Sequence, residues 1–306
     1  MKLPSRVRVV EVGPRDGLQN EASQVPTEVK ARFILGLTEA GYSEIEATSF
    51  VSPRWVPQLA DAEEVSTRLD LSSGRYTALV PNQKGLDRAL QLGYRRVAVF
   101  TAASEAFNLK NTNRNVAQSL LDFEPLFQQA QAAGVEVRAY VSTAWHCPYA
   151  GPIQPEAVLP VVERLLEMGA CEVSLGDTVG AAVPSEVERL LLRLQPQRLA
   201  LHFHDTSGTA LANVLLGLQM GITCFDASAG GLGGCPYAPG ASGNLASEDL
   251  LYMLSGMGIE TGVDLKRVAE ASLELARHLG RPLPSRCLAR FQAQPDCLAA
   301  KGNQLA

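Results

Sequence analysis

The chain has 306 residues, which is enough for one large domain or two ordinary ones. Its composition, with 46% apolar and 19% charged residues, is typical of a globular protein with a sizeable core. The net charge of −5 argues against a general nucleic-acid-binding protein, and the sequence has no apolar run of about 18 residues that would span a membrane.

The amino-terminal residues predict a cytoplasmic protein. The sequence MKLPSRVRVVEVG enters a strand-like run almost at once, so no signal or transit peptide is expected. The six cysteines show neither a CxxC pair nor the spacing of a disulfide scaffold. Free thiols are typical of a reducing compartment.

Eight strand-like runs alternate with helix-periodic stretches along the chain. The strands are predicted at residues 7–13, 43–50, 75–81, 95–102, 136–142, 171–176, 198–204 and 223–229. Several helices end at a glycine directly before a β-rich run, which suits the left-handed position after a helix. These glycines are Gly41, Gly93, Gly134, Gly169 and Gly221.

The repeated units predict an α/β fold, a (β/α)8 TIM barrel with an extra C-terminal helical segment. A doubly wound sheet is the alternative, although such sheets have about five or six strands. We expect a single catalytic domain over residues 1–285, with a glycine-rich active-site loop at 230–244. Residues 286–306 are predicted to form an irregular or flexible tail.

Polar side chains gather where the predicted strands end, which is the face that carries the chemistry in such barrels. In chain order they are Arg15, Asp16, Gln19, Glu46, Ser49, Asp177, His202, His204, Cys235 and Asn244. We therefore expect one active site at this end of the barrel.

The run LHFHDTSG contains two histidines that point to the same side of a strand, because side chains alternate along it. His202 and His204 can then share one cation, with Asp16 and Asn244 as oxygen donors. Two nitrogens and two oxygens suit Mg2+ or Mn2+ better than a closed zinc site. The alternative is two ordinary strand histidines and two turn residues.

Two further residues indicate chemistry at this mouth. Arg15 would place a positive charge where negative charge can develop on a carbonyl oxygen; the alternative is a salt bridge to Glu46. Cys235 lies in the loop GGLGGCPYAPG, where a thiol can act as proton donor or nucleophile. The alternatives are a buried cysteine or a phosphate cradle, but no Lys-Ser/Thr follows the glycines.

Five segments resemble the 3-hydroxy-3-methylglutaryl-CoA (HMG-CoA) lyase family, which belongs to the metal-dependent lyases and acyl-CoA synthases built on TIM barrels. They are GPRDGLQNE, SFVSPRWVPQ, SLGDT, H-x-HDT and GLGGCPYAPGASGN. The likeness runs from about residue 7 to residue 280. The cysteine-bearing glycine loop is its most specific part.

The resemblance implies a retro-Claisen-type lyase that cleaves HMG-CoA to acetyl-CoA and acetoacetate, with an acyl-CoA thioester substrate and a bacterial origin. It implies Asp16, His202, His204 and Asn244 as metal ligands, and Arg15 as the group that stabilises the enolate. It further implies Cys235 as the catalytic thiol and Glu46 and Asp177 as active-site carboxylates. Gln19 and Ser49 are candidate substrate contacts, and a homodimer is expected.

Several positions depart from the family pattern and bear on the acyl group accepted. They are Trp145, His146, Ser207 and Thr209. A lyase for a longer 3-hydroxy-3-substituted glutaryl-CoA, such as isohexenylglutaryl-CoA, is therefore the alternative. An acyl-CoA condensing synthase is a further one, but its chain is usually longer and lacks the GGCPY loop.

Overall fold

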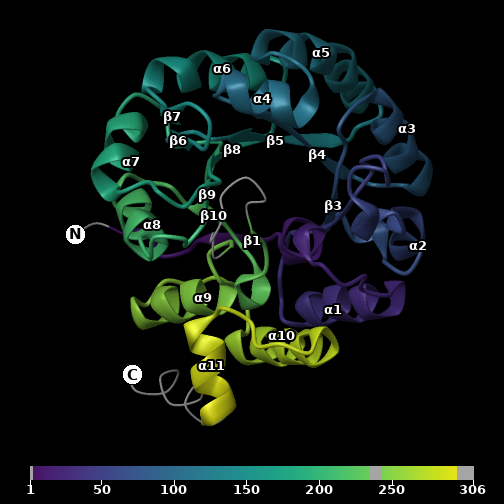
Figure 1. Cartoon of the computed structure of the whole chain (residues 1–306), viewed down its shortest axis with the longest axis vertical. Coiled ribbons are helices and arrows are strands. Elements are labelled where there is room, and N and C mark those ends of the chain that lie inside the picture. The colour runs from purple at the N-terminus through teal and green to yellow at the C-terminus, as the bar shows by residue number, and fades with distance from the viewer. Residues whose placement is uncertain (1–2, 235–242, 295–306) are drawn as a thin grey trace.

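The computed structural model describes residues 3–234 and 243–294. Eight parallel strands close into a barrel in the order β1-β2-β3-β4-β5-β8-β9-β10 (Figure 1). Their bounds are β1 Arg8–Glu11, β2 Ile45–Ser49, β3 Tyr76–Leu79, β4 Arg96–Ala102, β5 Glu136–Ser142, β8 Glu172–Asp177, β9 Leu199–Phe203 and β10 Cys224–Ala227. The predicted TIM barrel is confirmed.

Helices surround the barrel on its outer side (Figure 1). They are α1 Thr27–Glu39, α2 Ala62–Ser66, α3 Gln83–Leu92, α4 Glu105–Thr112, α5 Val116–Ala132, α6 Pro155–Glu167, α7 Pro184–Leu191, α8 Ala210–Gln219, α9 Ser247–Gly256, α10 Leu265–Leu279 and α11 Arg286–Ala293. The extra helix α10 packs against α1 and completes the outer ring. Among the residues described, no helix is long and apolar enough to cross a membrane.

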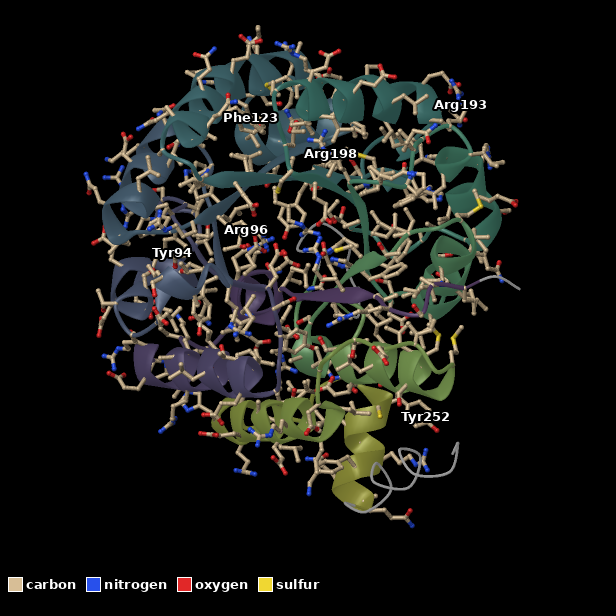
Figure 2. The ribbon with its side chains drawn as sticks, turned by 180° about the vertical axis from the view of Figure 1, so that it is seen from behind. Tyr94, Arg96, Phe123, Arg193, Arg198 and Tyr252 are labelled. Carbon is tan, nitrogen blue, oxygen red and sulfur yellow. The ribbon has the colours of Figure 1, made fainter. Side chains whose placement is uncertain are left out.

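Alternation along the strands separates an apolar layer from a polar barrel interior. On β9, Leu201 and Phe203 belong to the hydrophobic core between strands and helices. His202 lies between them in sequence and therefore faces the interior. The same alternation on β8 directs Ser174 inward, where its hydroxyl donates to the carboxylate of Asp226 on β10 at 2.8 Å. Figure 2 shows the molecule from the opposite side, with Arg96 at the strand ring and Arg193 at the periphery.

The tail prediction is wrong for residues 286–293, which form helix α11. The Ser285 hydroxyl caps this helix by accepting the Leu288 N–H at 3.1 Å. Asp249 on α9 accepts the N–H of Cys287 at 2.7 Å, and Leu288 and Phe291 are buried. Burial of this short apolar face against α9 stabilises a helix that is too short to form alone.

Candidate active site

A π-helical turn, Gly13–Gly17, follows β1 and carries Arg15 and Asp16. The N–H groups of Asp16 and Gly17 both donate to the Val12 carbonyl, at 2.8 and 3.2 Å. A Cβ added at Gly17 would lie 2.8 Å from the Leu232 Cβ, so only glycine fits here. Single π-turns are frequent at functional sites because they re-aim neighbouring side chains. This turn sends Arg15 toward β2 and Asp16 toward β9.

The structure brings all four predicted metal ligands together. Asp16, His202 and His204 offer ligand atoms that lie within 4.8 Å of one another. The backbone of Asn244 forms an isolated antiparallel β-bridge with that of His204. The Asn244 side-chain Nδ2 donates to Asp16 Oδ2 at 2.8 Å. The Asn244 Oδ1 is buried and has no hydrogen-bonding partner among the described residues. A buried carbonyl oxygen of this kind is suited to a cation ligand.

The protonation states of His204 and Asp16 also fit a cation. Burial and the neighbouring His202 lower the pKa of His204 to about 3, so this imidazole is neutral. Burial opposes ionisation of Asp16, but Arg15 and the two histidines lower its pKa, so it is a carboxylate. Metal ligands must be deprotonated. A neutral imidazole, a carboxylate and an amide oxygen form a donor set that fits Mg2+ or Mn2+.

Arg15 lies between two carboxylates and is only 7% exposed. Its Nε and Nη2 lie 2.7 and 2.6 Å from Glu46 Oε2, and its Nη1 lies 2.6 Å from Asp16 Oδ1. Burial would lower the pKa of this guanidinium, but Glu46 and Asp16 raise it. The salt bridge between Arg15 and Glu46, which the sequence suggested as the alternative role of Arg15, is present. It holds the guanidinium next to the ligand cluster.

The other predicted site residues differ in their distance from this cluster. Gln19 lies beside it, because its Nε2 donates to Asp16 Oδ1 at 2.9 Å. Ser49 accepts the N–H of Val51 at 3.2 Å, and the Asp177 carboxylate accepts backbone N–H groups from Gly180 and Ala182. In the described part of the chain, neither Ser49 nor Asp177 has a side-chain hydrogen bond to the cluster. Cys235 lies outside the described residues.

Two of the departures from the family pattern face other parts of the molecule. The Trp145 ring packs on Phe203, with centroids 5.6 Å apart, and Phe203 lies on the outer side of β9. His146 lies in a small β6 His146–Cys147 and β7 Gly151–Pro152 hairpin, with its Nε2 3.0 Å from Glu186 Oε2. These contacts direct both side chains away from the ligand cluster.

The sequence analysis did not single out Asp226, whose Oδ2 lies 3.3 Å from His202 Nδ1. The signal available was an aspartate inside the apolar run TCFDASA. A buried carboxylate there requires a partner. Fold and site together define the class: a TIM barrel with candidate ligands for a divalent cation and a buried guanidinium at its catalytic mouth.

Comparison with known proteins agrees with this class. The model of the HMGL-like family matches residues 6–274. Hydroxymethylglutaryl-CoA lyase YngG of Bacillus subtilis is 50% identical over 298 residues, which cover 96% of this chain and 100% of that protein. A crystal structure of a B. subtilis HMG-CoA lyase has a TM-score of 0.92 at 49% identity and covers 95% of this chain and 100% of its own.

A further solved structure is an HMG-CoA lyase in complex with coenzyme A and 3-methylmalate, from Acinetobacter baumannii. It has a TM-score of 0.88 at 38% identity and covers 100% of this chain and 99% of its own. The chain belongs to the HMGL-like family. The resemblance found in the sequence is thereby confirmed.

Proposed function

We propose that this chain is a hydroxymethylglutaryl-CoA lyase, which cleaves HMG-CoA to acetyl-CoA and acetoacetate. The observation that carries the proposal is the buried Arg15 guanidinium, 2.6 Å from Asp16 within the metal-type cluster at the barrel mouth. A sequence identity of 50% to a hydroxymethylglutaryl-CoA lyase, over 96% of this chain, supports the same activity.

The ligand cluster suits the first half of this reaction. We assign Asp16, His202, His204 and Asn244 as the residues that would hold Mg2+ or Mn2+. A bound divalent cation would supply Lewis acidity that lowers the pKa of the C3 hydroxyl of the substrate. The hydroxyl proton then leaves to a base, for which the sequence leaves Asp16, Asp177 or a water molecule. Backbone N–H groups of Gly180, Ala181 and Ala182 donate to the Asp177 carboxylate, but its burial outweighs them and raises its pKa.

Arg15 suits the second half. When the C2–C3 bond breaks, its electron pair passes to the enolate of acetyl-CoA, and a fixed positive charge stabilises that enolate. Glu46 holds the guanidinium in place through Nε and Nη2, so we assign it as a positioning residue. Cys235 is proposed to return the proton to carbon. This role is a prediction from the sequence alone.

Release of acetoacetate tests the proposal directly. Enzyme stripped of metal is assayed with HMG-CoA before and after addition of Mg2+ or Mn2+, and metal binding is measured separately. Metal-dependent release is expected. No release while metal is demonstrably bound would contradict the proposal and favour a longer 3-hydroxyglutaryl thioester or the reverse condensation. The homodimer, the cytoplasmic location and the choice of metal stay predictions.

A further inference from the structure

The two histidines of the ligand pair have different surroundings. Asp226 on β10 is the register partner of His202 on β9, so the two side chains lie next to each other in the barrel interior. The His202 Nδ1 lies 3.3 Å from Asp226 Oδ2, an ion-pair distance, and is buried without a hydrogen bond to any described residue. His204 Nδ1 is buried and has no hydrogen-bonding partner there.

Asp226 is itself held from two sides. Arg138 Nη2 donates to its Oδ1 at 2.7 Å, and the Ser174 hydroxyl donates to its Oδ2 at 2.8 Å. The side chains of Arg138 and Asp226 are 1% and 0% exposed. A buried carboxylate is stable as an anion only when it is paired and hydrogen-bonded in this way. Its oxygen therefore stays in place beside His202.

The pairing continues below this point. Arg138 Nε contacts Glu172 Oε1 at 2.8 Å, and Glu172 in turn pairs with Arg8. Charges of alternating sign thus run from Arg8 through Glu172 and Arg138 to Asp226, which lies next to His202. Glu172 pairs with Arg138, as Asp226 does. Unlike Asp226, it is separated from His202 by two other residues in this chain of contacts, Arg138 and Asp226. It therefore offers a matched control for a change at Asp226.

We propose that Asp226 is a positioning residue that accepts the Nδ1 proton of His202 and so leaves Nε2 of that ring for the cation. An imidazole can bind metal through either nitrogen, and the hydrogen bond made by one nitrogen selects the other. A carboxylate in this position also makes the imidazole a stronger ligand. The inference rests on the proposed cation site and assigns it a residue outside the ligand set.

Metal affinity of the substrate-free enzyme tests the inference. Free Mn2+ is measured by electron paramagnetic resonance for wild type, Asp226→Asn and Glu172→Gln. Removal of a carboxylate that orients a ligand typically weakens metal binding about 10–100-fold, and we expect this loss in Asp226→Asn. We expect Glu172→Gln to bind close to wild type. At low Mn2+ the lyase rate of Asp226→Asn should be lower than that of wild type. At saturating Mn2+ it should come closer to the wild-type rate.

Equal Mn2+ affinity in Asp226→Asn and wild type would overturn the inference and leave the proposed function standing. So would an equal loss in the Glu172→Gln control. Absence of Mn2+ and Mg2+ binding by wild type would instead overturn the cation site on which both depend.

A measurement on wild type covers the case in which Asp226→Asn does not fold. Nuclear magnetic resonance of Mg2+-loaded protein with 15N-labelled histidine should show the proton of His202 on Nδ1. A proton on Nε2 would overturn the inference.

Discussion

Arg15 combines a structural and a chemical role in one side chain. It bridges Glu46 and Asp16, and both its own burial and that of Glu46 make the pair costly to break. Loss of activity after a simple substitution could therefore report misfolding. A pair of variants separates the two roles.

We expect Arg15→Met to lower kcat for HMG-CoA cleavage at least about 100-fold, because the charge that stabilises the enolate is removed. It should also destabilise the fold by about 3–5 kcal/mol, because it leaves the Glu46 carboxylate buried and unpaired. The double variant Arg15→Met/Glu46→Gln removes both charges. Urea unfolding should show recovered stability in the double variant while kcat stays low. Recovery of kcat together with stability would refute the chemical role.

Asp177 and Ser49 illustrate how a polar residue at a strand end can serve the backbone. Asp177 accepts three backbone N–H groups in the turn before α7, and Ser49 accepts one after β2. A strand end is where the chain changes direction and exposes N–H groups. Short polar side chains are common there for that reason.

At the scale of elements, two of the glycines between a helix and the next strand differ in how much space a side chain would have. Gly41 and Gly93 both have positive φ, at 101° and 92°. A Cβ at Gly41 would lie 2.5 Å from the Gly262 carbonyl oxygen, in the segment that leads into α10. A Cβ at Gly93 would meet no atom within 4 Å. The two positions therefore separate backbone strain from steric fit.

We expect Gly93→Ala to cost about 1–2 kcal/mol of unfolding free energy, the usual cost of the left-handed conformation for alanine. Gly41→Ala should cost more by about 1–3 kcal/mol, because its Cβ also displaces the backbone before α10. Urea denaturation of the two single variants gives the difference. Equal losses would mean that the α1–α10 contact yields freely to the added methyl group.

At the scale of the whole molecule, two buried carboxylates tie distant segments to the turn at Ala229 and Gly230. Glu11 on β1 accepts the N–H groups of Gly13 and Ala229 at 2.8 and 2.9 Å. Glu248 on α9 accepts the N–H of Gly230 at 2.9 Å and the hydroxyl of Ser272 on α10. No cation pairs with either carboxylate among the described residues. Burial raises the pKa of each to about 7.

These pKa values make stability depend on pH. Because the folded pKa of about 7 lies above the ordinary glutamate value of 4.5, each group favours folding at low pH. That contribution is lost as the pH rises from about 4.5 through 7, by roughly 3 kcal/mol for each fully buried group. Urea unfolding between pH 5 and pH 8 should therefore show a steeper decline for wild type than for Glu11→Gln/Glu248→Gln. Parallel curves would contradict the raised pKa values.

Much of this molecule could be predicted from its sequence, because the relevant signals are local. The period of two in HFH places His202 and His204 on one face, and glycines such as Gly41 mark the ends of helices. The barrel follows because eight such units are more than the five or six strands of a usual doubly wound sheet and match the number that closes a barrel. The common mouth of a parallel barrel then brings Asp16 and Asn244 to the histidines.

Other features depended on contacts between distant segments. Asp226 meets His202 only because β9 and β10 pair in one particular register, and Arg138 compensates Asp226 from across the barrel interior. Helix α11 forms because α9 covers its apolar face and Asp249 satisfies its first turn. The sequence alone determined the eight barrel strands and the candidate ligand types, since periodicity and residue chemistry are properties of neighbours along the chain. Only the tertiary structure decided which buried charges share a partner, because the cost of burying a charge depends on what closure of the barrel brings next to it.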